Sequence, residues 1–241
     1  MPPAAPRPAP ADRLVDVAVR LAAREGVEAL TLRRIARRAG VSHGAPLRHF
    51  ASLADLLSGV AARGFRLLRE TIERSADGLP AGAGALPRLA AAGRAYVGCA
   101  IENPGLFALM FRPEALDAAN ARLRRDSQDA FEQLLRLVRA AQDAGWYEDR
   151  DTRLLAGAVW SAVHGLATLW AQGALASPLP RASLDDALAT TLELLLGHPA
   201  PALEGWRPAK SRPPGLRSAS PRFAAATPPR PARPRKPSRK G

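Results

Sequence analysis

The 241-residue sequence predicts an all-α protein, and three observations point to that fold class. Apolar residues between positions 14 and 196 recur at the i, i+3, i+4, i+7 spacing of amphipathic helices. The sequence contains neither strand-like alternation nor an internal repeat. Five of the 23 prolines lie in residues 1–10 and eleven in residues 197–241, so few are left to interrupt helices between them. We therefore expect a helical body between two disordered ends, 1–10 and 197–241.

The predicted helices have recognisable ends. The first carries its apolar face on residues 14–21 and stops at Gly26, and the second spans 32–39 and stops at Gly40. The third begins after Ser52, which forms a capping-box pattern with Asp55. Five more helices are expected over residues 86–102, 105–112, 117–144, 151–172 and 184–196.

The segment 154–180 contains no charged residue and is long enough to span a membrane. Its polar residues, among them Ser161, His164 and Thr168, fall on one side of a helix, with aliphatic residues opposite. A helix with such a polar stripe is typical of burial between protein layers, so we expect no membrane partner. The single cysteine excludes an internal disulfide and favours a reducing, cytoplasmic setting.

The net charge of +13 is distributed unevenly. Residues 197–241 hold eleven basic residues and one acidic residue. Residues 31–50 hold five arginines and no acidic residue. Because a basic patch without acids is the electrostatic pattern of a surface that docks on a phosphate backbone, the charge distribution predicts a nucleic-acid site near residue 40.

The segment from Thr31 to Phe50 has the pattern of a helix-turn-helix. Gly40 allows the left-handed conformation that ends a helix, and Ser42 can cap the next one, which in this motif enters the major groove. The predicted core residues are Ile35, Ala39, Val41 and Phe50, with Val41 as an apolar plug for the corner. The candidate DNA-binding residues are Thr31, Arg33, Arg34, Ser42, His43, Gly44, Ala45, Arg48 and His49.

This segment resembles the DNA-binding domain of the TetR family of bacterial transcription regulators. The resemblance covers residues 8–68 and rests on Thr31, Ile35-Ala36, Ala39-Gly40-Val41-Ser42, Gly44 and His49-Phe50. It implies a three-helix domain with its helix-turn-helix at 31–50. Two positions that touch DNA phosphates in the family are apolar here, Leu47 and Leu53, and Pro46 removes an amide from the recognition helix. We therefore expect weakened phosphate contacts and a tight or kinked start to that helix.

A second resemblance covers residues 86–196. The segments Asn103–Phe111 and Trp160–Leu166 resemble the TetR subgroup whose C-terminal domain is named for a Trp-His-Gly motif. It implies a helical dimerisation and effector-binding domain over 69–196, with the last two helices at the dimer contact. The candidate ligand-binding residues are Phe107, Met110, Phe111, Trp160, Ser161, His164 and Thr168. The alternative is that His164 is a hydrogen-bonded core residue and that the aromatic residues are ordinary packing.

The sequence lacks the motifs of common catalytic, metal and nucleotide sites, namely His-Glu-x-x-His, Cys-x-x-Cys, Gly-x-Ser-x-Gly and the P-loop, so we expect no enzyme, no metal and no cofactor. We expect a sequence-specific transcriptional repressor of the cytoplasm, at the nucleoid. Its expected partners are a double-stranded DNA operator, a second copy of the chain and an unknown small-molecule effector. Two alternatives stay open: a ligand- or protein-binding dimer with a weakened helix-turn-helix, or a non-specific nucleic-acid binder that uses the basic tail.

Overall fold

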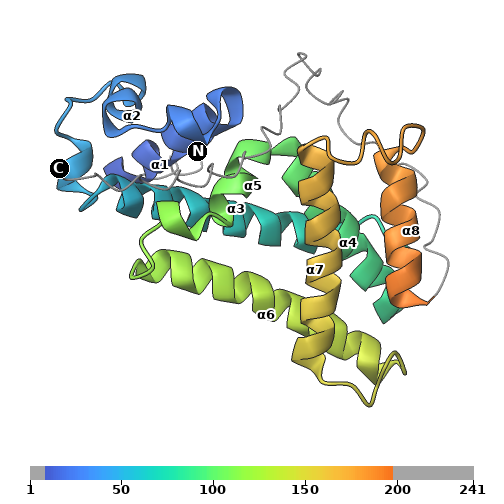
Figure 1. Ribbon diagram of the computed structural model, residues 1–241. Coiled ribbons are helices and arrows are strands. Elements are labelled where there is room, and N and C mark those ends of the chain that lie inside the picture. Colours follow the sequence, from blue (N-terminus) through green and yellow to red (C-terminus); the bar gives the residue numbers. More distant parts are fainter. Residues whose placement is uncertain (1–8, 198–241) are drawn as a thin grey trace, which may run out of the picture. The chain divides into compact units, whose positions relative to one another are not determined.

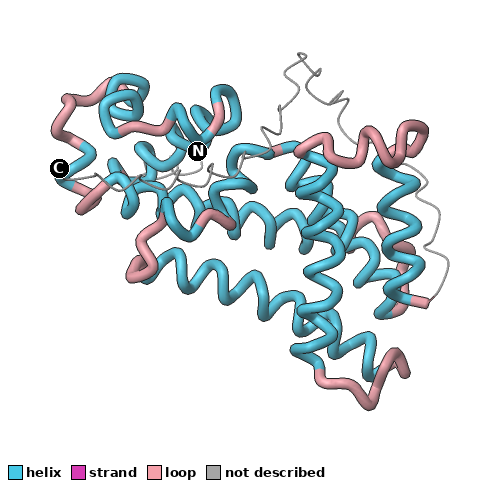
Figure 2. The backbone as a smooth tube through the Cα atoms, viewed as in Figure 1, coloured by secondary structure: helices cyan, strands magenta, loops and turns pink. Residues whose placement is uncertain are grey.

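The computed structural model describes residues 9–197, and within this range all regular secondary structure is helical, without a strand (Figure 2), which confirms the all-α fold. Its α-helices are α1 (Pro10–Glu25), α2 (Leu32–Ala39), α3 (Leu53–Ser75), α4 (Ala85–Glu102), α5 (Pro104–Met110), α6 (Ala121–Asp143), α7 (Thr152–Ala171) and α8 (Leu184–Leu196). Short 3-10 helices are η1 (Val27–Ala29), η2 (Pro46–Arg48) and η3 (Pro113–Ala115). The disorder predicted for residues 1–8 and 198–241 lies outside the described residues. Pro10, predicted to be disordered, is the first residue of α1, where its missing N–H costs no hydrogen bond.

Helix α3 is shared by the N-terminal and C-terminal parts of the fold (Figure 1). It packs against α1 as well as against α4, α5 and α6. Because α3 is continuous from Leu53 to Ser75, the predicted domain boundary at residue 68 falls inside a helix. Its first turn is capped by Ser52, whose hydroxyl accepts a hydrogen bond from the Asp55 amide at 3.1 Å. The Asp55 carboxylate accepts from the Ala51 amide, one residue earlier than a reciprocal capping box requires.

The N-terminal helices contribute to one apolar core that continues into the C-terminal helices. Leu14 and Val15 of α1, Ile35 of α2 and Val60 of α3 are all buried there. Helices α1 and α3 approach closely at Gly59, where a Cβ atom would lie 3.2 Å from the Val15 side chain. A larger residue at this position would separate the two helices that carry the predicted DNA-binding corner.

The C-terminal helices pack around α4, with α7 in contact with α4, α6 and α8 (Figure 1). In the described range, α7 is the one helix long and apolar enough to cross a membrane. One of its sides is buried at Val159 and Val163, but Leu154 on another side is 76% exposed. Within a single chain, α7 is therefore buried on one side and not, as predicted, between two protein layers.

Candidate functional site

The corner predicted to bind DNA is present, and its first helix is fixed at both ends. The Thr31 hydroxyl caps α2 by accepting a hydrogen bond from the Arg34 amide at 3.3 Å. Gly40 ends the helix in the left-handed conformation, with φ 67° and ψ 31°, as its sequence predicts. The Val41 amide then donates to the Ala36 carbonyl at 3.1 Å, which closes the turn.

The recognition element that follows is a turn and a 3-10 helix, where the family resemblance predicts an α-helix. Proline has no amide, so Pro46 cannot donate to the Ser42 carbonyl as an α-helix starting there requires. The Ala45 amide donates to that carbonyl instead, at 3.0 Å. The chain then continues as η2, and the Phe50 amide donates to the Pro46 carbonyl at 2.9 Å. Pro46 thus tightens the recognition element into a single short turn.

Burial at the corner also differs from the prediction at one position. Val41, predicted as the apolar plug, is 38% exposed, whereas Pro46 is buried. Ile35 and Phe50 are buried as predicted, and Ala39 is half-buried. The short turn brings the proline ring inward and leaves Val41 at the surface.

The arginines of α2 fall into two pairs with different surroundings. Arg34 and Arg38 both bind the Glu25 carboxylate at the end of α1, Arg38 through an Nη2–Oε1 distance of 3.0 Å. They fasten α2 to α1. Arg33 and Arg37 are exposed and make no ion pair with any residue in the described part of the chain. Of the two candidate DNA-binding arginines in α2, Arg33 is therefore available to a phosphate and Arg34 is engaged.

The remaining candidate DNA-binding residues lie together at the surface of the corner. Ala45 is half-buried, and the exposed members of the set are Thr31, Ser42, His43, Gly44, Arg48 and His49. Leu47, one of the two departures from the family pattern, is 57% exposed, and Leu53, the other, is half-buried. The corner consequently presents cationic side chains together with one well-exposed apolar side chain, Leu47.

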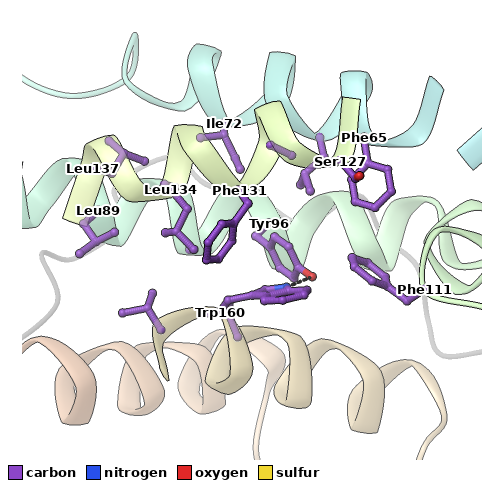
Figure 3. A pocket seen from close by; sticks show the side chains of 16 residues that line it. Phe65, Ile72, Leu89, Tyr96, Phe111, Ser127, Phe131, Leu134, Leu137 and Trp160 are labelled. Carbon is purple, nitrogen blue, oxygen red and sulfur yellow. Dashed lines mark hydrogen bonds between the residues drawn. The ribbon is translucent and has the colours of Figure 1, made fainter. Parts of the chain in front are cut away.

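A second feature is a partly open cavity of about 280 Å³ lined by residues of α3, α4, α6 and α7 and by Phe111 (Figure 3). Its walls are almost entirely aliphatic and aromatic, and none of the side chains that line it is charged. Phe65 comes from α3, Tyr96 from α4, Phe131 from α6 and Trp160 from α7. A cavity of this composition suits an apolar small molecule.

The structure brings two of the seven candidate ligand-binding residues, Phe111 and Trp160, to the cavity wall. Phe107 and Met110 are buried behind it, and Met110 packs against α3 at Gly64. Ser161 is exposed on α7, and the half-buried Thr168 also lies outside the cavity lining. The helical phase of α7 is the reason for these two positions, because Ser161 and Thr168 do not share the side on which Val159, Trp160 and Val163 line the cavity.

His164 stands behind the wall in a hydrogen-bonded network that the sequence did not reveal. The Tyr96 hydroxyl lies 2.7 Å from Nδ1 of His164, and the Trp160 indole N–H donates to the same hydroxyl at 3.0 Å (Figure 3 shows the second bond). The His164 ring also packs against Phe111, with ring centroids 4.5 Å apart. Tyr96 was missed by sequence reasoning, although it is the single aromatic residue between positions 85 and 102. The hydrogen bond to Tyr96 agrees with the alternative interpretation of the sequence, in which His164 is a hydrogen-bonded core residue.

Proton positions in this network follow from burial. Burial lowers the pKa of His164 and raises the pKa of Tyr96, so both groups are neutral at pH 7. If Nδ1 carried a proton, the Tyr96 hydroxyl would accept from both neighbours and its own buried hydrogen would have no acceptor among the three residues. The assignment that gives the Tyr96 hydrogen an acceptor has Tyr96 donating to Nδ1, with the imidazole protonated at Nε2.

This network predicts a pH dependence of stability. Histidine titrates near pH 6.5 in an unfolded chain, whereas burial lowers the pKa of His164 in the folded protein. The unfolded state binds more protons between these two values, so the free energy of unfolding falls as the pH decreases through that window. We expect the melting temperature to decrease on acidification from pH 7.5 to 5.5, and to decrease less in His164→Gln, whose side-chain oxygen can still accept from Tyr96. Parallel curves for the two proteins would show that His164 does not titrate in this range.

Among residues 9–197, no group of three or more His, Cys, Asp or Glu side chains is placed to hold a metal ion. The candidate binding sites in that range are thus the cationic corner and the apolar cavity.

Both features lie in segments that match known family models. Residues 14–60 match the family model described as bacterial regulatory proteins, tetR family. Residues 89–195 match a model described as a tetracyclin repressor-like C-terminal domain. The first match contains the corner, and the second contains most of the residues that line the cavity. No significant match was found among curated proteins.

Solved structures share the fold over most of their length. A protein of unknown function from Rhodococcus sp. RHA1 is 30% identical, with a TM-score of 0.68 over 80% of this chain and 97% of that one. PfmR, a TetR family transcriptional regulator from Thermus thermophilus, is 20% identical with a TM-score of 0.57, covering 78% and 98% of the two chains. The transcriptional regulator FadR from Bacillus subtilis, solved in complex with stearoyl-CoA, is 20% identical with a TM-score of 0.55, covering 77% and 97%. On these matches and on the geometry of the corner, the chain belongs to the TetR family of bacterial regulatory proteins and is a DNA-binding, ligand-responsive transcriptional regulator.

Proposed function

We propose that the chain is a homodimeric repressor, which binds a near-palindromic operator through residues 31–50 and releases it when a small molecule occupies the apolar cavity. The observation that carries this proposal is that α5 links the cavity to α1, the helix on which α2 of the corner packs. Phe111, directly after α5, lines the cavity. Gly105, near the start of α5, packs on α1, where a Cβ atom would lie 2.6 Å from the Ala22 carbonyl oxygen. A ligand that moves Phe111 would therefore move the support of the DNA-binding helices.

Two side-chain contacts support this route. The Phe111 ring packs against Phe65 of α3 and Trp160 of α7, with centroid distances of 5.6 and 5.9 Å. It therefore contacts the cavity wall on α3 and the wall on α7. The adjacent Arg112 pairs with Glu28 of η1 at 2.7 Å. Coupling free energies of about 1–3 kcal/mol suffice for regulation. Small rearrangements at Phe111 and Arg112 involve free energies of this size.

The surface of α7 and α8 supports the homodimer. Leu154 of α7 and Leu194 of α8 are 76% and 81% exposed in the single chain. On α7, nothing lies within 4 Å of a Cβ atom added at Gly157 or Gly165, so a second helix could approach there closely. Exposed leucines beside glycines are typical of a helix pair that is completed by a partner. A dimer would place two recognition elements about 34–36 Å apart, as successive major grooves require.

The apolar cavity supports a small-molecule effector with a large hydrocarbon or aromatic portion. FadR from Bacillus subtilis, which shares the fold, was solved with stearoyl-CoA, a molecule with a long hydrocarbon chain. The packing of His164 against Trp160, with ring centroids 5.9 Å apart, also supports membership of the subgroup named for its Trp-His-Gly motif. We place the protein in the cytoplasm at the nucleoid, as a binding protein and not an enzyme.

The experiment that tests this function measures binding of the full chain to DNA fragments from upstream of its own gene, with competitor DNA. A working repressor binds one fragment in preference to competitor. In the double variant Leu47→Tyr, Leu53→Lys, two phosphate contacts per chain are restored. We expect operator affinity to rise a few-fold and the slope of log K against log salt to steepen by about 1.8 per dimer, because only the Leu53→Lys change adds a positive charge that releases a counterion.

The alternative of a weakened helix-turn-helix predicts a different outcome for the same pair of proteins. The original chain would then bind no fragment preferentially, and the variant would gain binding from almost nothing. The basic tail provides the second comparison. In a chain ending at Gly197, we expect operator preference to persist while affinity for competitor DNA falls, because eleven basic residues are lost. Loss of the preference itself would favour the non-specific alternative.

A further inference from the structure

We infer that the cavity selects an uncharged, predominantly hydrocarbon ligand and rejects carboxylate, phosphate and ammonium groups. This inference rests on the proposed function only in taking the cavity ligand to be the effector. Its basis is a count of the polar atoms that the cavity lining can offer, all of which already have partners inside the protein.

Three side chains in the lining carry a hydrogen-bond donor, and each has a single hydrogen to give. The Trp160 indole N–H donates to the Tyr96 hydroxyl at 3.0 Å. The Tyr96 hydroxyl in turn lies 2.7 Å from Nδ1 of His164, to which it donates in the tautomer assigned above. The Ser127 hydroxyl donates to the Arg124 carbonyl of its own helix at 3.1 Å. The remaining lining side chains are aliphatic or aromatic hydrocarbon, or glycine, so the cavity has no donor left for a ligand.

An anion that entered this cavity would lose its water and gain no hydrogen bond in return. Transfer of an ionised carboxylate into apolar surroundings without compensating donors is prohibitive. A cation would fare no better, because none of the lining side chains carries a carboxylate. A hydrocarbon or aromatic molecule loses nothing by leaving water and gains dispersion contacts with Phe65, Phe131 and Trp160.

The surface beside the cavity does not supply the missing charges. Ser127 and Phe131 line the cavity and also a neighbouring groove, which contains Asp129, Glu132 and Arg153. Glu132 is paired with Arg153 at 3.3 Å, and Asp129 is paired with Arg69 of α3 at 3.3 Å. Charges of both signs are neutralised locally, so a ligand with a charged head extending into this groove would find no unpaired counter-ion.

Three probes that share an eight-carbon chain test the inference on the full-length protein: 1-octanol, octanoate and octylammonium at pH 7.5, each without DNA. Binding is followed by tryptophan fluorescence and by the shift in melting temperature. We expect octanol to bind at least about 30-fold more tightly than either ion. Equal binding of octanoate or octylammonium, or no saturable binding of octanol, would overturn the proposal.

Variants locate the binding and control for folding. Ala130→Phe on α6 and Ala92→Leu on α4 each extend a lining side chain into the cavity, and we expect each to weaken octanol binding at least tenfold. Ala140→Phe adds the same ring at an exposed position of α6 and should leave binding unchanged. Octanol binding that survives both filling variants would place the ligand elsewhere and overturn the assignment. Operator release is measured separately: if octanol binds in the cavity but DNA stays bound, the effector role fails while the cavity chemistry stands.

Discussion

Arg33→Ala is expected to weaken operator binding by roughly tenfold or more while leaving the melting temperature unchanged. Arg33 is exposed on α2 and makes no ion pair with a residue in the described range, so its charge is available to a phosphate. Each dimer loses two such contacts, and the slope of log K against log salt should become shallower by about 1.8. Fluorescence anisotropy on a labelled operator at several salt concentrations measures both quantities.

Arg34→Ala is the matched control, since it removes the same side chain from the next position. Arg34 binds Glu25 together with Arg38, and its side chain is 37% exposed. We expect it to lower the free energy of unfolding by about 0.2–1 kcal/mol and to change the salt slope less than Arg33→Ala does. A larger change in salt slope for Arg34→Ala than for Arg33→Ala would mean that the Glu25 pairs open on DNA, and our division of the arginines would be wrong.

Gly105→Ala is expected to destabilise the fold by about 1–3 kcal/mol and to reduce operator affinity by roughly tenfold. The added Cβ would lie 2.6 Å from the Ala22 carbonyl oxygen and 3.2 Å from the carbonyl carbon, and backbone atoms cannot rotate away as a side chain can. Helices α1 and α5 must therefore separate, which shifts the DNA-binding corner relative to the cavity wall at Phe111. Thermal denaturation and operator anisotropy measure the two effects on the same sample.

Gly78→Ala is the control for this prediction, because an added Cβ there meets nothing within 4 Å and its φ lies outside the left-handed region. We expect it to leave both quantities unchanged. An intermediate case is Gly64→Ala, whose Cβ would meet the flexible side chain of Met110 at 2.6 Å. Unaltered stability in Gly105→Ala would show that α1 and α5 are not held in contact in solution.

Local features of the fold were predictable from sequence because neighbouring residues determine them. Gly40 ends α2 in the left-handed conformation, and Ser52 caps α3. Pro46 is also local, and its missing amide replaces the expected recognition helix with a short turn. The family pattern favoured a helix at this point, but the covalent chemistry of one residue decided the outcome.

The cavity was predicted only in part, because its walls come from helices that are distant in sequence. Tyr96 and His164 are 68 positions apart, and only the fold brings them within hydrogen-bonding distance. The pairing of Arg34 with Glu25 spans nine positions across η1. A run of arginines in the sequence indicates positive charge, but the turn between α1 and α2 determines which of them pair with Glu25.

Hydroxyl-radical footprinting on duplexes selected from a random-sequence pool tests the central claim most directly, namely that residues 31–50 of a dimer read duplex DNA. The selected sequences should share a near-palindrome, with two protected half-sites whose centres are about 10–10.5 base pairs apart. Arg33→Ala should fade both half-sites together, and Gly78→Ala should leave them intact. Uniform protection without a shared sequence, or half-sites that are unaffected by Arg33→Ala, would contradict our assignment of the corner as the operator-binding surface.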